Sequence, residues 1–160
     1  MGIEIVPDGK GFLLVASMRV PRPIAEVFDF FSNARNLERL TPPSLRFHVL
    51  TEGPIEMAEG TRIDYQLKVH KIPIRWQSEI TAWEPPYRFV DEQSRGPYRW
   101  WVHEHLFEEQ GEFTFVRDRV RYAAPGGRLM NRLFVARDLR KIFAFRAKAL
   151  ADVFGTAERD

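Results

Sequence analysis

Residues 12–31 read FLLVASMRVPRPIAEVFDFF and contain the strongest indication of how the chain folds. Residues 12–20 are rich in apolar and β-compatible side chains and end at Pro21, which predicts a strand. Pro23 is compatible with the first turn of a helix, and beyond it apolar residues recur at every third or fourth position. These residues are Ile24, Val27, Phe28 and Phe31. The sequence therefore predicts a strand that leads directly into a short amphipathic helix.

After this helix the hydrophobic period changes to two. A second helical turn is expected through Leu37 and Leu40, ending at Pro42. From residue 45 to about 123, apolar and polar residues alternate between turn signals. Examples of these signals are Gly53-Pro54, Gly96-Pro97 and Gln110-Gly111. The pattern predicts a meander of long antiparallel strands that packs on one face.

The C-terminal segment returns to helical spacing after the glycine pair at 126–127. Its apolar stripe comprises Val135, Leu139, Ile142, Ala149 and Val153. The other face is basic and carries Arg128, Arg132, Arg137, Arg140, Lys141 and Lys148, and Asp138 is the only acid between residues 128 and 148. This pattern predicts a long helix that covers the sheet with its apolar stripe and leaves the basic face solvated.

Together these elements predict an α+β helix-grip fold. A curved antiparallel sheet wraps around the long C-terminal helix, and two short helices follow the first strand. We expect one domain over residues 1–160, with a core of about 12–154 and frayed ends at 1–9 and 155–160. A sheet that curls around a helix leaves an internal space between them.

This order of elements resembles the START-related superfamily of polyketide cyclases, aromatic-ring-binding proteins and lipid-transfer domains (SRPBCC). The stretch VPRPIAEVF at 20–28 is similar to the usual strand-to-helix entry of that superfamily. The stretches DEQSRGPY at 91–98 and WVHEHLF at 101–107 resemble an uncharacterised ligand-binding branch. The resemblance implies a ligand cavity between sheet and helix. It does not select among carriers, receptors and enzymes.

Composition excludes several other classes. The 160 residues contain no cysteine, which rules out disulfides, thiolate catalysis and Cys-based metal centres. The 24 basic and 22 acidic side chains nearly cancel, so a nucleic-acid partner is not expected. No apolar run is long enough to span a bilayer, and the start does not look like a signal peptide, so we expect a soluble cytoplasmic protein. The oligomeric state is left open.

Alternation on two predicted strands points to a polar cluster inside the sheet. Three arginines at 117, 119 and 121 favour solvent, which turns Asp118 inward. On the preceding strand, an outward Glu104 turns His103 and His105 inward. A hairpin near Gln110-Gly111 then brings one of these histidines within reach of Asp118.

This inward His–Asp pair has several interpretations. It is a structural network, or it orients the polar end of an apolar ligand, or it is catalytic. In the catalytic case His103 or His105 acts as general acid or base, and Asp118 holds its tautomer. Two histidines at i and i+2 with a carboxylate could also hold a metal ion. We assign no metal and no cofactor.

Aromatic residues make up 13% of the chain, which favours either an aromatic-lined cavity or a bulky core. The candidate ligand-binding residues are Tyr65, Trp76, Asp91, Gln93, Trp101, His103, His105, Phe107, Asp118, Tyr122, Phe143 and Leu150. The segments at 41–43 and 96–98 are candidates for the cavity rim.

The leading functional hypothesis is binding of a small hydrophobic or amphipathic molecule of lipid, polyketide or aromatic type. An alternative is a cyclase, dehydratase or isomerase that uses the His–Asp pair. A third, less favoured hypothesis is peripheral membrane contact through the basic C-terminal helix, for lipid exchange.

Overall fold

The computed structural model describes residues 2–156 of the chain. Its main feature is one antiparallel sheet of eight strands in the order β1-β2-β8-β7-β6-β5-β4-β3. The strands are β1 (Gly2–Asp8), β2 (Gly11–Val20), β3 (His48–Val49), β4 (Arg62–Val69), β5 (Ile72–Glu84), β6 (Arg88–Arg95), β7 (Trp100–Gln110) and β8 (Phe113–Ala123). Only the β2–β8 pair joins strands that are not consecutive in the described chain. The predicted meander is therefore confirmed.

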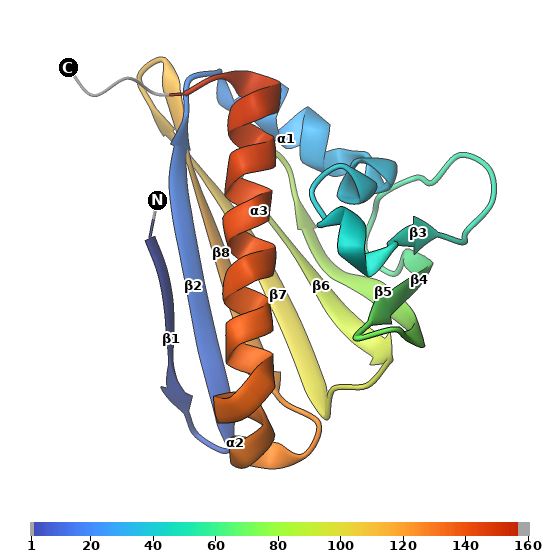
Figure 1. Ribbon diagram of the computed structural model, residues 1–160. Coiled ribbons are helices and arrows are strands. Elements are labelled where there is room, and N and C mark those ends of the chain that lie inside the picture. The colour runs from blue at the N-terminus through green and yellow to red at the C-terminus, as the bar shows by residue number, and fades with distance from the viewer. Residues whose placement is uncertain (1, 157–160) are drawn as a thin grey trace.

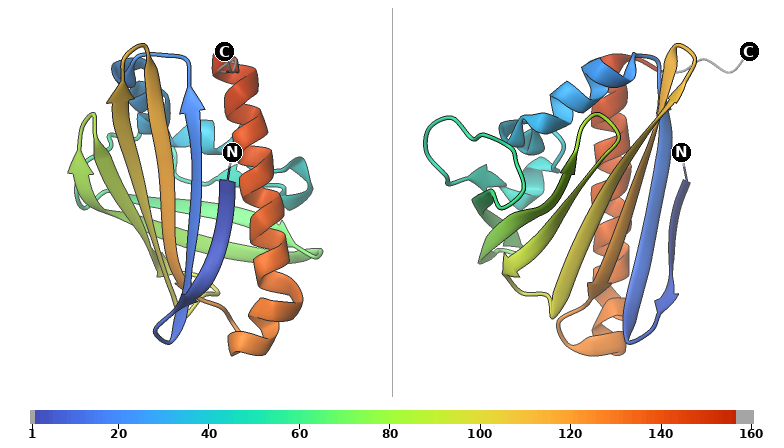
Figure 2. Two further views of the ribbon diagram at one scale, coloured as in Figure 1. Left: turned by 90° about the vertical axis from the view of Figure 1, so that its left-hand side faces the viewer. Right: turned by 180° about the vertical axis from the view of Figure 1, so that it is seen from behind.

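The helices all lie on one side of this sheet (Figures 1 and 2). They are α1 (Ile24–Ser32), the 3-10 turns η1 (Ala34–Glu38) and η2 (Pro43–Leu45), the short α2 (Gly127–Met130), the π-helical turn η3 (Asn131–Val135) and α3 (Ala136–Phe154). The sheet curves around α3, as the sequence predicts. The expected second short helix is two separate 3-10 turns, because proline at 42 and 43 stops any continuation.

The N-terminal segment corrects one expectation. Residues 2–8 are not frayed but form the edge strand β1, paired with β2 along its whole length. Ile3 and Ile5 alternate with exposed neighbours and pack against the cluster around Leu14 and Phe143. Burying these two side chains offsets the cost of ordering the segment. Of the C-terminal residues expected to fray, 157–160 lie outside the described residues.

One end of the concave face is filled by side chains. Phe28 and Phe31 from α1 meet Phe107 from β7, with ring centroids 5.2 and 5.1 Å apart. Phe89 and Leu150 close the same cluster from β6 and α3. Because α1 occupies this end, the remaining space lies at the other end, beneath η1 and η2. Within the described residues, no helix has both the length and the apolar character required to cross a membrane.

Candidate functional site

A cavity of about 210 Å³ lies between the sheet and α3. Aromatic and aliphatic side chains form most of its wall, and a few polar groups gather at its inner end. The lining residues are Leu37, Leu40, Thr41, Leu45, Phe47, Tyr65, Leu67, Val69, Ile74, Trp76, Ser78, Asp91, Pro97, Tyr98, Trp101, His103, His105, Leu139, Ile142, Phe143 and Arg146. Thr41 and Pro97 belong to the two segments predicted as the rim. An apolar cleft with a few convergent polar groups is the usual form of a small-molecule site.

Three aromatic rings of this wall hold one another in place. Trp76 packs edge-on against Trp101 with centroids 5.4 Å apart, and Tyr98 contacts both rings at 5.6 and 4.9 Å. The Trp76 indole N–H donates to Ser78 at 3.1 Å. Burial raises the pKa of Tyr65 and Tyr98, so both phenols remain protonated near neutral pH. The wall is a preformed apolar surface with neutral polar edges.

Strand register brings the charged groups of the inner end together. On β7, His103 lies opposite Asp91 of β6, and His105 lies opposite Asp118 of β8. Hydrogen bonds run along the diagonals of this arrangement. His103 Nε2 lies 2.8 Å from Asp118 Oδ1, and His105 Nε2 lies 2.6 Å from Asp91 Oδ2. Each imidazole therefore bonds the carboxylate that is opposite the other imidazole.

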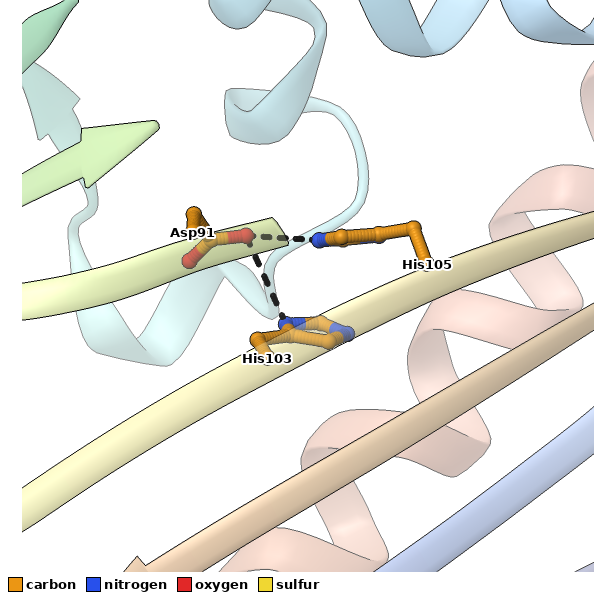
Figure 3. A group of neighbouring side chains, drawn as sticks. All are labelled: Asp91, His103 and His105. Carbon is orange, nitrogen blue, oxygen red and sulfur yellow. Dashed lines mark hydrogen bonds and ion pairs between the residues drawn. The ribbon is translucent and has the colours of Figure 1, made fainter. Parts of the chain in front are cut away.

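The two imidazole rings stack on each other, with centroids 3.7 Å apart (Figure 3). Asp91 Oδ2 faces both rings, because His103 Nδ1 also lies 3.9 Å from it. Asp118 Oδ1 faces both rings from the other side, with His105 Nδ1 at 3.4 Å. This paired geometry confirms the predicted contact between an inward histidine and Asp118, and it adds Asp91.

Arg146 on α3 completes the cluster. Its Nη2 lies 3.3 Å from Asp118 Oδ1 and 3.4 Å from His105 Nδ1. Since the guanidinium and the imidazole face the same carboxylate oxygen, both donate to it. Arg146 is 7% exposed, and its Nε has no hydrogen-bond partner. A buried guanidinium requires such a carboxylate, since an unpaired charge would be strongly destabilising.

The environment fixes the charge of the two carboxylates. Burial alone would raise the pKa of Asp118, but the Arg146 guanidinium and hydrogen bonds from both histidines hold it well below its usual range. For Asp91, burial is likewise outweighed by the hydrogen bond from His105 and by the nearby positive charges, which lower its pKa. Both carboxylates are ionised at neutral pH.

The pKa values of the two histidines shift in opposite directions. Burial, together with the charge of His105, lowers the pKa of His103 despite its hydrogen bond to Asp118. Burial acts the same way on His105, but its hydrogen bonds to Asp118 and Asp91 outweigh it and raise the pKa. The raised pKa favours the cationic form of His105, which together with Arg146 would balance the two carboxylates. Neutral His103 donates through Nε2, which leaves the lone pair on Nδ1.

The cluster also contains a possible metal-ligand set. One ligand atom each from Asp91, His103 and His105 lies within 4.8 Å of the others, a combination that suits a divalent transition metal. The hydrogen bond between His105 and Asp91 occupies two of these atoms, and Arg146 places a positive charge beside them. The arrangement therefore fits a shared proton better than an ion.

The structure separates the predicted ligand-binding residues into two groups. Seven of them line the cavity: Tyr65, Trp76, Asp91, Trp101, His103, His105 and Phe143. The other five do not line it, and their role in ligand binding stays a prediction: they are Gln93, Phe107, Asp118, Tyr122 and Leu150.

Asp118 lies behind the two histidines and Arg146 and does not itself line the cavity. Gln93 bonds the backbone of Tyr98 and so stabilises the β6–β7 turn. Phe107 and Leu150 belong to the filled end of the concave face. Tyr122 packs near Leu14 and donates its hydroxyl to Asn131 at 2.8 Å. Strand alternation predicts that each of the strand residues faces inward. It does not predict which end of the concave face each residue occupies.

Sequence reasoning missed Arg146, although a signal was present. Arg146 follows Phe143 by three residues and Ile142 by four, so it lies on the apolar stripe of the helix. A single charge at a buried stripe position requires a buried counter-charge, and Asp118 is that partner. Apart from Thr41 in the predicted rim segment, the lining residues from 37 to 47 had no such signal, because their position depends on the path of a loop.

Comparisons with known proteins agree with this fold. No protein-family model matches the chain, and no curated protein matches it in sequence. Among solved structures, protein CV1439 from Chromobacterium violaceum has a TM-score of 0.72 at 10% identity, over 91% of this chain and 98% of that chain. Protein Ms6760 from Mycobacterium smegmatis has a TM-score of 0.69 at 16% identity, over 95% and 97%. Ginseng major latex-like protein 151 from Panax ginseng has a TM-score of 0.67 at 12% identity, over 91% and 99%.

These likenesses, together with the curved eight-stranded sheet and long C-terminal helix, define a protein with the helix-grip fold. Its structural neighbours include this major latex-like protein, so the predicted fold is confirmed. At identities this low, the comparisons establish the fold alone.

Proposed function

We propose that this protein binds a small amphipathic molecule in the cavity between the sheet and α3. One observation carries the proposal: an aromatic and aliphatic wall encloses space that side chains leave free, and it ends at a charged cluster with open hydrogen-bonding atoms. Membership of the START-related superfamily is part of the same proposal. The ordered rings of Trp76, Tyr98 and Trp101 favour a ligand with a flat apolar body.

The open polar atoms specify the other end of the ligand. Within the described residues, Asp91 Oδ1 makes no hydrogen bond, and the Asp91 side chain is 19% exposed. His103 Nδ1 carries a lone pair and lies 3.9 Å from the other Asp91 oxygen. Both open atoms are acceptors. The ligand therefore presents a donor here, such as a hydroxyl or an N–H group.

The cavity volume limits the size of the apolar body. About 210 Å³ corresponds to roughly seven water molecules at their liquid volume. This space suits one or two fused rings. A molecule with long acyl chains would need the wall to open. We therefore favour the aromatic or polyketide type of ligand over an extended lipid.

A matched pair of probes tests the proposal. We expect 2-naphthol to bind, and to bind at least tenfold more tightly than 2-methylnaphthalene, because only the naphthol donates a hydrogen bond to the charged end. Calorimetry measures both affinities, and native mass spectrometry of freshly purified protein detects any natural ligand. Equal affinities would contradict the proposal that the ligand donates a hydrogen bond to the charged end. Absence of all binding would contradict the proposal that the cavity binds a small molecule.

Two variants separate the cavity from nonspecific surface binding. Ile74→Trp fills the cavity from β5 and should weaken 2-naphthol at least tenfold. Leu106→Trp places the same ring on the opposite face of the sheet, since Leu106 alternates with the inward His105. It should leave the affinity unchanged. A similar loss in both variants would place the bound probe outside the cavity.

A second candidate function, a cyclase, dehydratase or isomerase, is favoured by the paired histidines. Neighbouring groups whose pKa values move apart suit a base and an acid in one site. His103 Nδ1 would accept a proton from the ligand, and cationic His105 would stabilise charge through the cluster. Any ligand recovered from the protein should then exchange carbon-bound hydrogen in D₂O with wild type and not with His103→Gln. A ligand that is neither converted nor exchanged would contradict the enzyme and support binding as the function.

A further inference from the structure

The segment before α3 exposes an unusual amount of apolar surface. Leu129, Met130, Leu133 and Phe134 are 64%, 38%, 50% and 42% exposed, and all lie within six residues of one another. They belong to α2 and η3, and α2 lies at the end of the molecule opposite α1 (Figures 1 and 2). A contiguous exposed apolar patch on a single protein usually marks an interaction surface.

Local structure holds these side chains outward. Asn131 is buried and accepts the Tyr122 hydroxyl, which anchors the inner side of the segment. The π-helical turn η3 then changes the helical phase, and the buried stripe resumes at Leu139. Leu133 and Phe134 therefore point away from the sheet. Single π-helical turns are frequent at functional sites.

The surroundings of this patch are strongly basic. Residues 127–141 carry five cationic side chains and one carboxylate, Asp138, which contacts His70. The formal net charge of the whole chain is only +2, so the rest of the chain is net acidic. Within the described residues, none of these five cations forms an ion pair. They are Arg128, Arg132, Arg137, Arg140 and Lys141.

A second apolar side chain approaches from the sheet. The contact of 2.8 Å between His70 and Asp138 brings the β4–β5 turn beside the helix. Ile72, two residues beyond His70, is 64% exposed, and Lys71 adds another exposed cation. Phe134 precedes Asp138 by one helical turn, so it lies on the same helix face. Ile72 and Phe134 thus belong to the two segments, the β4–β5 turn and the start of the C-terminal helix, that the His70–Asp138 contact joins.

We propose that this surface, formed by Ile72, Leu129, Met130, Leu133 and Phe134 with the exposed cations of the same segments, docks on an anionic lipid bilayer. Apolar side chains enter the boundary of the acyl chains while arginine and lysine contact the headgroups. Charge complementarity selects this occupant, because a second copy of the patch would bring cations against cations. The basic helix raised as a membrane contact in the sequence thus becomes a surface centred on α2 and η3.

Vesicle sedimentation tests the proposal. We expect the protein to sediment with vesicles of phosphatidylcholine and phosphatidylglycerol in a ratio of about 7:3, and not with phosphatidylcholine alone. Raising the salt from about 0.05 to about 0.5 M should weaken binding at least tenfold, because screening shortens the reach of the cations. Failure to sediment with the anionic vesicles at low salt, or equal binding to both vesicle types, would overturn the proposal.

Matched variants assign the binding to the patch. Leu133→Ser with Phe134→Ser should weaken vesicle binding at least tenfold, leave the far-UV spectrum unchanged and lower the melting temperature only slightly, because both side chains are about half exposed. Tyr87→Ser, which removes an exposed ring from the β5–β6 turn, should have no effect. Unchanged binding by the double variant would overturn the proposal. So would a wild-type dimer that the double variant converts to monomer without any vesicle binding.

Discussion

The two ends of the concave face use the same sheet and the same helix in different ways. At one end, α1 packs phenylalanine rings against β6 and β7 and leaves no space. At the other end, the 3-10 turns, the β4–β5 hairpin and α3 border a cavity that side chains leave free. The contrast shows that the helix-grip architecture leaves room for a cavity, while the segment after β2 decides how much of it is filled.

A stack of rings forms the boundary between the two ends. Phe89 of the filled end stacks on His105 with centroids 4.0 Å apart and an interplanar angle of 11°. His105 stacks on His103, and His103 meets Trp101 of the cavity wall at 6.3 Å. The charged cluster is therefore supported from behind by packed core. Such support holds polar groups in a defined position for a ligand.

The largest expected effect compares one side chain from each end. Phe28→Ala should destabilise the protein by about 4 kcal/mol, because a buried ring leaves a cavity that the core cannot close. Ile74→Ala should cost about 1 kcal/mol, because Ile74 is partly exposed and already borders free space. Urea denaturation of both variants measures the difference. Equal losses would mean that the open end is packed as tightly as the filled end.

The boundary cluster should show the next largest effect. Arg146→Met keeps the length of the side chain but leaves Asp118 buried without its guanidinium, so we expect a loss of about 3 kcal/mol. Adding Asp118→Asn removes the unpaired charge and should restore part of the stability. Lys148→Met, an exposed cation on the same helix, should stay within about 0.5 kcal/mol of wild type. Lack of rescue by Asp118→Asn would argue against the ion pair.

The pH dependence of stability should separate the two histidines. The pKa of His105 is raised, so its stabilisation is complete below the unfolded value of about 6.5 and is lost as the pH rises through the folded value. The pKa of His103 is lowered, so its contribution is present above about 6.5 and is lost as the pH falls. Over any pH range in which one group differs by a full proton, the free energy of unfolding changes by about 1.4 kcal/mol per pH unit.

Urea denaturation across the pH range between about 5 and 9 checks this prediction. Wild type should be most stable near neutral pH. His105→Gln should flatten the alkaline side of the profile, and His103→Gln should flatten the acidic side. The same slopes in both variants would mean that the two rings do not hold different protonation states.

The fold was largely predictable because each element carries its own signal. The proline pair at 21 and 23 marks the strand-to-helix junction, and the uninterrupted stripe after residue 135 marks the long helix. The edge strand β1 was missed, since two isoleucines at 3 and 5 are too few to distinguish a strand from a disordered end. Pairing with β2, a tertiary interaction, decides the outcome there.

The site was only partly predictable. Alternation placed His103, His105 and Asp118 on the inner face, because arginines and Glu104 fixed the outer face. Alternation says nothing of position along the concave face, so Phe107 and Tyr122 were assigned to the cavity although they belong to the core. Arg146 could have been predicted only by noticing that one charged residue occupies a position on the apolar stripe of the helix. The lining residues of η1 and η2 depend on a loop path that local sequence does not encode.

The smallest expected effect concerns the open end alone, at the contact between His70 and Asp138. The His70 side chain is 59% exposed, so His70→Ala should change the free energy of unfolding by no more than about 0.5 kcal/mol. The same contact ties the β4–β5 turn to α3 beside Val69 and Leu139, which line the cavity. Breaking it should therefore let the turn move and speed the release of 2-naphthol, as stopped-flow tryptophan fluorescence would measure.

His48→Ala removes another exposed histidine with a carboxylate partner, on β3, and should leave the release rate unchanged. An unchanged rate in His70→Ala would mean that ligands do not enter beside this turn. The rim segments at 41–43 and 96–98, which border the same cavity away from the turn, would then be the expected entrance.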